Sequence, residues 1–301
     1  MTNRFITQLS LIDEVLPASV VVNVASVPQR SPFRYPGGKT WLVPKIRQWL
    51  GAFPEKPIEL IEPFAGGAIV GLTAAFENLA EHVTLIERDE QVSAVWRTII
   101  TDRSGAEWLA RQIEAFEMTP DSLAEALTHS TRSTRQQAFQ TILKNRTNHG
   151  GILAPGAGVL KHGENGKGLL SRWYPATLAR RIRAIGAIRD RLTFIQGDGL
   201  EMLKEIADRS AMVCFIDPPY TASAKRAGSR LYTYHQIDHE DLFSTSSRLA
   251  GDFLMTYDDA DEVRSLASRH NLVTRLVAMN NTHHATMTEL LIGRNLDWLK
   301  D

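Results

Sequence analysis

The strongest constraint on the fold is the stretch VCFIDPPY, residues 213–220, in which four apolar residues run into an acid, two prolines and a tyrosine. An uninterrupted apolar run of this kind predicts a strand that is buried on both faces. Consecutive prolines lack backbone N–H donors and restrict the residue before them, so the strand has to stop at Asp217. A carboxylate, a rigid turn and an aromatic ring therefore follow directly on a buried strand.

Predicted strands and helices alternate along most of the chain. Residues 56–67 read as a strand and a turn that lead into a helix, and residues 82–90 and 91–100 repeat the pattern. The alternation resumes at residue 192, and two final strands, over 271–280 and 285–293, are expected to form a hairpin. This spacing predicts an α/β fold with a doubly wound, mostly parallel sheet.

A basic segment interrupts the alternation. Residues 101–145 and 176–191 read as helical, whereas residues 146–175 are too rich in glycine for regular elements. Residues 130–191 hold 12 Lys and Arg against two acids, although the whole chain balances 34 basic and 34 acidic residues. Such asymmetry favours a patch for a polyanion, and a solvated face with unconnected arginines is the alternative.

Three regions follow from this organisation. Residues 31–100 and 192–301 are predicted to form one domain, and residues 101–191 a basic, mainly helical insertion. Residues 1–30 are an N-terminal arm of unknown role, with one short strand expected over 20–24. The single cysteine, Cys214, excludes an intrachain disulfide and a cysteine-cluster metal site. No metal site, signal peptide or membrane span is predicted, and the expected compartment is the cytoplasm.

Acidic residues stand where several predicted strands end. Gly66 and Gly67 allow a tight turn after the first strand, and Glu87, 21 residues after Gly66, is placed to accept from a ribose hydroxyl. Asp198 follows another strand, where it either faces a ligand or caps the next helix. The full glycine pattern of nicotinamide-binding folds is missing, which disfavours a dehydrogenase.

Taken together and in this order, the motifs RYPGGK (34–39), EPFAGG (62–67), DPPY (217–220) and ELLI (289–292) resemble those of a known family. They are similar to the Dam-type, DPPY-containing DNA adenine-N6 methyltransferases, which use S-adenosylmethionine. The resemblance covers about residues 31–293. It implies a class I, Rossmann-like methyltransferase domain that carries a target-recognition insertion, and an enzyme that methylates double-stranded DNA at specific sites.

The resemblance also implies roles for single residues. Tyr35 and Lys39 would contact S-adenosylmethionine, Glu87 would hold its ribose and Asp198 its adenine amine, with Asp89 a competing candidate for the ribose. The methionine end of the cofactor would be lined by Glu62, Phe64, Gly66 and Gly67, with Asp217 beside it. The catalytic residues would be Asp217, Pro218, Pro219 and Tyr220.

The chemistry of adenine methylation suits the DPPY motif. The target base has to be flipped out of the duplex, and Tyr220 would stack on it. The Asp217 carboxylate and the Pro218 carbonyl would accept the two hydrogens of the amine, and Pro219 would keep that turn rigid. Because the sulfonium already makes the methyl group electrophilic, no metal is required.

The insertion would read the DNA. Candidates for base-edge contacts are Asn145, Arg146, Lys161 and Lys167, and candidates for phosphate contacts are Arg172, Arg180, Arg181 and Arg183. A second basic segment after DPPY adds Lys225, Arg226 and Arg230. The target sequence stays open, and a restriction endonuclease partner is compatible with the resemblance. Cytosine-N4 methylation, RNA adenine methylation and a non-catalytic DNA-binding module are the alternatives.

Overall fold

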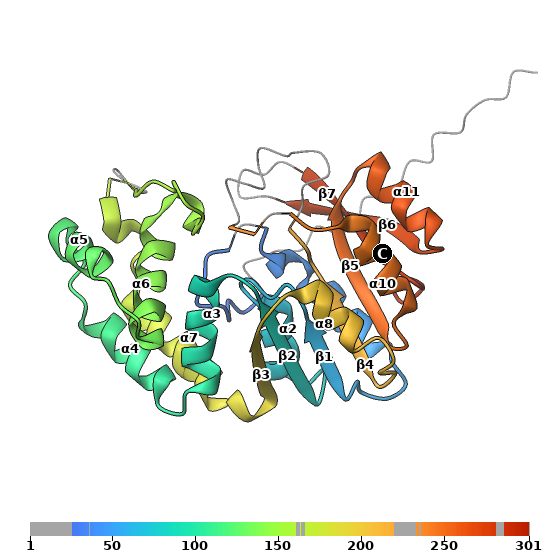
Figure 1. Ribbon diagram of the computed structural model, residues 1–301, viewed down its shortest axis with the longest axis horizontal. Coiled ribbons are helices and arrows are strands. Elements are labelled where there is room, and N and C mark those ends of the chain that lie inside the picture. Colours follow the sequence, from blue (N-terminus) through green and yellow to red (C-terminus); the bar gives the residue numbers. More distant parts are fainter. Residues whose placement is uncertain are drawn as a thin grey trace, which may run out of the picture.

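The structure is a computed structural model that describes residues 26–300 apart from residues 36, 161–162, 164–165, 220–232, 235 and 281–285. Seven strands form one sheet in the order β3-β2-β1-β4-β5-β7-β6 (Figure 1). The strands are β1 (Glu59–Glu62), β2 (His82–Glu87), β3 (Leu192–Gln196), β4 (Met212–Ile216), β5 (Asp252–Asp258), β6 (Val273–Asn280) and β7 (Thr286–Gly293). β1 to β5 are parallel, whereas β7 is antiparallel to β5 and β6, which confirms both the mostly parallel sheet and the terminal hairpin.

Helices cover both faces of the sheet. One face packs against η2 (Lys39–Leu42), α1 (Val43–Gly51), α2 (Ile69–Glu77) and α3 (Glu90–Trp96), and the other against α8 (Gly199–Glu205), α10 (His239–Arg248) and α11 (Asp261–Arg269). α3 continues into a short π-helical turn, η3 (Arg97–Thr101). Among the described residues, no helix is long and apolar enough to cross a membrane.

β4 is buried on both faces, as its apolar run predicts. Val213 and Phe215 pack into the hydrophobic cluster with α1 and α2, whereas Cys214 and Ile216 pack into the cluster with α8 and α10. The pairing of β4 with β5 ends at Ile216. The two prolines that follow therefore stand outside the ladder, where a missing N–H donor costs no sheet hydrogen bond.

The strand order places a crevice at the ends of β1 and β4. From β1 the chain proceeds through β2 to β3 on one side, and from β4 it proceeds to β5 on the other. In open parallel sheets the crevice at such a switch point, outside the carboxyl ends of the strands, is where ligands bind. Glu62 is the last residue of β1, and Asp217 directly follows β4.

Most of the predicted insertion is helical. It contains α4 (Gly105–Ala115), α5 (Pro120–Thr128), α6 (Thr134–Thr147) and α7 (Pro175–Ala187), with the short turns η4 (His149–Gly151), η5 (Gly168–Arg172) and η6 (Arg189–Arg191). α4 packs on α7, α5 on α6, and α6 on α3, so the helices lie beyond the β3 edge of the sheet (Figure 1). The limits of the domains stay a prediction.

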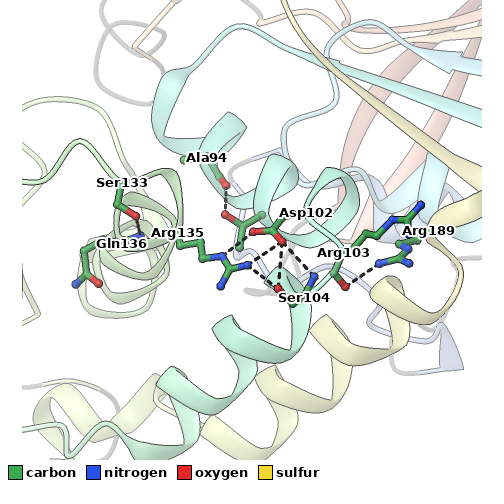
Figure 2. Close-up of polar contacts among 9 residues, drawn as sticks. Ala94, Asp102, Arg103, Ser104, Ser133, Arg135, Gln136 and Arg189 are labelled. Atoms are coloured by element: carbon green, nitrogen blue, oxygen red, sulfur yellow. Dashed lines mark hydrogen bonds and ion pairs between the residues drawn. The ribbon is translucent and has the colours of Figure 1, made fainter.

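Some of the basic residues in this region hold the fold together. Arg135 at the start of α6 makes a bidentate ion pair with Asp102, with Nε 2.6 Å and Nη2 2.9 Å from the two carboxylate oxygens (Figure 2). The same guanidinium donates to Ser104 Oγ, and Arg189 donates to the carbonyl of Arg103 at 2.7 Å. These contacts fix α6 and η6 to the turn that follows η3.

The described end of the predicted N-terminal arm packs against the same fold. Val27 is buried in the core, and Arg30 Nη2 lies 2.9 Å from Glu77 Oε1. The short strand expected over residues 20–24 lies outside the described residues.

A close approach between α8 and the β1–α2 turn gives a test of this packing. A Cβ at Gly199 would lie 2.1 Å from the carbonyl oxygen of Pro63. We expect Gly199→Ala to lower the free energy of unfolding by about 1–3 kcal/mol, since the backbones have to move apart. The matched control is Gly51→Ala at the end of α1, where a Cβ meets nothing within 4 Å. Urea denaturation measures both, and equal stabilities would contradict the packing.

Candidate active site

A cavity of about 650 Å³ lies at the carboxyl ends of β1, β2 and β4. It brings together residues from the N-terminal segment before η2, the β1–α2 turn, the start of α8 and the turn after β4. Its lining includes all the cofactor-binding candidates: Tyr35, Lys39, Glu62, Phe64, Gly66, Gly67, Glu87, Asp198 and Asp217. Pro218 and Pro219 line it as well, whereas Tyr220 lies outside the described residues.

The glycine turn after β1 is shaped by its neighbours. Gly66 has φ +47°, a backbone conformation that side chains disfavour, and a Cβ there would lie 2.6 Å from the ring of Tyr35. The indole of Trp96 donates to the Gly66 carbonyl at 3.0 Å from within the core. This role of Trp96 cannot be read from the sequence, because an apolar helix face gives no sign of a hydrogen bond to a turn 30 residues earlier.

Glu62 is buried and serves as the N-terminal cap of α2. Its Oε2 accepts from the Gly71 N–H at 2.7 Å. The residue at the cap position, Ala68, has no side-chain acceptor for this N–H group, so Glu62 supplies one. Burial raises the pKa of Glu62 well above its ordinary value, the hydrogen bond opposes this rise, and the charge of Asp217 adds to it. The acid predicted to line the methionine end is therefore a structural part of the turn as well.

Glu87 bridges the glycine turn and the next turn. Its two oxygens accept from the backbone N–H groups of Gly66 at 2.9 Å and Asp89 at 2.8 Å. Burial raises the pKa of Glu87 to about 7 against the effect of these hydrogen bonds. The competing candidate, Asp89, is buried and caps α3 by accepting from the N–H groups of Gln91 and Val92.

Asp198 caps the helix that follows it, which is one of the two roles considered for it, and it also lines the cavity. Its Oδ1 caps α8 by accepting from the N–H groups of Leu200 and Glu201, while its Oδ2 pairs with Arg88 at 2.9 Å and lines the cavity. The Arg88 guanidinium also lies over the ring of Tyr234, 4.6 Å from its centroid. This pair extends the cavity wall toward the chain that follows the DPPY motif.

Asp217 is held by groups from two other elements. Its Oδ1 accepts from the hydroxyl of Thr256 on β5 at 2.8 Å and lies 3.0 Å from Lys39 Nζ. Pro218 beside it is buried. Since both contacts act on the same carboxylate oxygen, they fix the plane in which the carboxyl group faces the cavity.

Lys39 lines the cavity from a buried position, so its predicted contact with the cofactor stays a prediction. Its ammonium group is buried, donates to the Gly37 carbonyl at 2.9 Å and lies between Asp217 and Glu289 of β7, 3.6 Å from the latter. A buried ammonium group is stable only when it is paired with acceptors of this kind. At the cavity wall, Lys39 therefore serves as the ion-pair partner of Asp217 and Glu289. Glu289 is the first residue of the ELLI motif, but the motif alone indicated no role for its carboxyl group.

Asn145 and Arg146 are not on the surface, so their assignment to base edges is corrected. Asn145 is fully buried and accepts from the Arg34 N–H, while its amide donates to the carbonyls of Arg34 and Gly151. Arg146 is 6% exposed and donates to the Pro32 carbonyl. Burial, with nearby Arg181 second, lowers the pKa of Arg146 to about 10.

The phosphate candidates separate into two groups. Arg183 is paired through Nε with Glu107 and through Nη1 with Glu114 of α4, both at 2.7 Å, so the structure assigns it to the α4–α7 contact. Arg181 donates to the Ser31 carbonyl at 3.1 Å and lines the cavity. Arg180 is exposed, and so is Lys167, whereas Arg172 is half-buried. The remaining candidates, Lys161, Lys225, Arg226 and Arg230, lie outside the described residues.

Solved structures of methyltransferases are similar to this chain. The rRNA methyltransferase AviRa from Streptomyces viridochromogenes shares 14% identity at a TM-score of 0.38, with 86% of each chain covered. A precorrin-6y C5,15-methyltransferase from Geobacter metallireducens shares 9% identity at a TM-score of 0.36, with 84% of this chain and 87% of that one covered. No curated protein sequence matches the chain.

One family model matches the chain. It describes the D12 class N6 adenine-specific DNA methyltransferases and covers residues 35–149. The match begins at Tyr35 in RYPGGK, includes the Gly66–Gly67 turn and Glu87, and extends to the end of α6. S-adenosylmethionine is the methyl donor that this family implies. The match over residues 35–149 confirms the resemblance of the motifs to the D12 class N6 adenine-specific DNA methyltransferases.

Proposed function

We propose that the protein transfers a methyl group from S-adenosylmethionine to the exocyclic amine of an adenine that is flipped out of double-stranded DNA at a specific sequence. The observation that carries the proposal is the placement of Asp217. Its carboxylate is oriented by Lys39 and Thr256 and lines the same cavity as the Gly66–Gly67 turn and Glu87. An acceptor for an amine and the acceptors for a nucleoside thus meet in one crevice.

The cavity suits S-adenosylmethionine in size and chemistry. Its volume of about 650 Å³ falls within the range of roughly 300–1,000 Å³ that is common for small-molecule sites. The two oxygens of Glu87 accept from the backbone N–H groups of Gly66 and Asp89, and a carboxylate with about four lone-pair sites keeps capacity for a ribose hydroxyl. When bound, the cofactor supplies an electrophilic methyl group.

The protein's part in the reaction is to prepare the amine. Two acceptors, the Asp217 carboxylate and the Pro218 carbonyl, would take hydrogen bonds from the two amine hydrogens and localise the nitrogen lone pair. After transfer the nitrogen is cationic, and the negative charge of Asp217 stabilises it until a proton leaves. Tyr220 would stack on the flipped base, a contact worth about 1–3 kcal/mol.

DNA binding would rest on exposed basic side chains. Arg180 and Lys167 are exposed and accessible to phosphates. Further contacts to the phosphates or to the target base would come from Arg172, Lys161, Lys225, Arg226 and Arg230. Arg181 at the cavity wall would contact the nucleotide that enters it. A site-specific methyltransferase also suits a restriction–modification pair, in which methylation protects host sites. Sequencing modified bases in a methylation-free host that expresses the protein would identify the target site.

The first prediction concerns Asp217. We expect Asp217→Asn to reduce methyl transfer by about 10²-fold or more, because the amide loses the negative charge that stabilises the cationic nitrogen. The measurement is transfer of labelled methyl groups from S-adenosylmethionine to unmethylated DNA, followed by digestion to nucleosides. Asp208→Asn, at the exposed opposite end of β4, is the matched control.

The products of this assay separate the alternatives. Label in N6-methyladenosine of RNA, or in N4-methylcytosine, would replace the substrate in the proposal. Binding of DNA without transfer by the wild type would favour a non-catalytic DNA-binding module. Full activity of Asp217→Asn would refute the mechanism while leaving the family unchanged.

A second prediction follows from Glu87, whose pKa is about 7. Below pH 7 the carboxyl is protonated and accepts more weakly, so the dissociation constant of S-adenosylmethionine should rise as the pH falls through this value. Glu87→Gln should weaken binding by roughly 10- to 100-fold at alkaline pH and flatten this dependence. Calorimetry measures both, with the exposed neighbour variant Glu90→Gln as control. A pH dependence that is unchanged in Glu87→Gln would remove Glu87 from the ribose site.

A third prediction compares two arginines of α7. Arg180→Ala should weaken DNA binding and reduce the slope of log affinity against log salt by about 1, as expected for the loss of one phosphate contact. Arg183→Ala should leave the slope unchanged and instead lower thermal stability, because its guanidinium is paired with Glu107 and Glu114. Titrations at several salt concentrations decide this, and a reversed pattern would exchange the two roles.

A further inference from the structure

A buried lysine lies between two carboxylates behind the candidate active site. Lys39 Nζ is 3.0 Å from Asp217 Oδ1 and 3.6 Å from Glu289 Oε2. Lys39 and Glu289 are 2% and 3% exposed, whereas the Asp217 side chain is 21% exposed and lines the cavity. Only one of the two acidic partners of Lys39 therefore reaches the site, and Glu289 acts on it from the interior.

Different elements bring these groups together. Lys39 begins η2, Asp217 follows β4, and Glu289 lies on β7, where its backbone pairs with Asp258 of β5 and Val277 of β6. Among the residues that the structure describes, the charged groups that act on Glu289 are Lys39, Asp217 and Asp258, and its partner on β6, Val277, is apolar. Hydrogen bonds of the sheet fix the register of β4, β5 and β7. They therefore hold the Glu289 side chain close to Lys39 in the interior, while Asp217 faces the cavity.

One ammonium group cannot fully neutralise two carboxylates, of which Glu289 is buried and Asp217 is partly exposed. Burial lowers the pKa of Lys39, but the charges of Asp217 and Glu289 outweigh it and the pKa is raised overall, so the lysine stays protonated. Burial raises the pKa of Glu289 to about 7, with Lys39 opposing the rise and Asp217 and Asp258 adding to it. Burial likewise raises the pKa of Asp258. Glu289 is therefore the buried partner of Lys39 that changes charge near neutral pH.

We propose that Glu289 is a positioning residue for methyl transfer that controls, through Lys39, how strongly Asp217 stabilises the amine. This rests on the proposed function of Asp217. With Glu289 protonated, Lys39 pairs with Asp217 alone and offsets its negative charge. With Glu289 ionised, Lys39 is shared and the negative potential at Asp217 rises. The cationic nitrogen of the methylated amine is then better stabilised, and its proton passes to Asp217 while the N–H electron pair stays on nitrogen.

The test compares pH–rate profiles. Single-turnover methyl transfer, with DNA and S-adenosylmethionine both saturating, should rise through about pH 7 in the wild type. In Glu289→Gln this rise should vanish, and the rate on the alkaline side should fall about tenfold or more, as for the loss of one charge at close range. The dissociation constants of both substrates should not change, because Glu289 is buried.

Two variants serve as controls. Glu289→Asp keeps a titratable carboxyl and should retain a rise in rate with a shifted midpoint, because the shorter side chain changes the distance to Lys39. Glu59→Gln makes the same carboxyl-to-amide change at the opposite edge of the sheet, where Glu59 pairs with Arg209. It should keep the wild-type profile. A merely structural role for Glu289 would lower the rate equally at every pH.

An infrared titration gives a readout without activity. The carbonyl band of a protonated carboxyl should disappear through about pH 7 in the protein without substrates, and the wild-type minus Glu289→Gln difference isolates Glu289 from Glu87. If Glu289→Gln fails to fold by circular dichroism, the comparison is made with Glu289→Asp. An identical band midpoint in that variant would overturn the proposal.

The outcomes separate the two levels of inference. An active wild type with the same pH–rate profile as Glu289→Gln would overturn the role of Glu289 and leave the proposed function standing. A wild type that methylates no nucleic acid would overturn the proposed function, and the infrared titration would then decide whether Glu289 exchanges a proton beside Lys39.

Discussion

The carboxylates of Glu62, Glu87, Asp198 and Asp217 line one cavity at the carboxyl edge of the sheet, and holding them there is the constraint on which the site depends. Each is stabilised by a donor that also builds the fold: Glu62 by the N-terminus of α2, Glu87 by two turns, Asp198 by α8, and Asp217 by Lys39 and Thr256. Acceptors fixed in this way suit hydroxyl and amine donors, which are what a nucleoside and an adenine amine present. The same contacts make the site inseparable from the packing of the sheet.

Close backbone contacts set the positions of these acids. Gly66 allows the ring of Tyr35 to lie against the turn, and Gly199 brings the start of α8 onto the Pro63 carbonyl. Because α8 begins directly after Asp198, the distance between Asp198 and the glycine turn depends on this contact. Small residues at the two places thus determine how near the acids at the ends of β1 and β3 can come.

Much of the fold and part of the site could be predicted from the sequence. The alternation of strands and helices and the acids at strand ends are local patterns, and the rule that parallel strands share a carboxyl edge joins them. The contacts of Asn145, Lys39 and Glu289 were not predictable, because they join residues far apart in the chain. Counting charges also could not distinguish Arg183, which pairs with acids of α4, from exposed Arg180.

The helical insertion and the carboxylate of Asp217 are connected through the segment before η2. The carbonyls of Ser31, Pro32 and Arg34 accept from Arg181, Arg146 and Asn145, all of which belong to the insertion. Three residues after Pro36 the same segment reaches Lys39, whose ammonium group holds Asp217. A displacement of α6 or α7 relative to the sheet therefore acts on the segment that orients the carboxylate. Buried Arg146 and Asn145, together with half-buried Arg181, thus connect the helices of residues 101–191 physically to the segment that holds the Asp217 carboxylate.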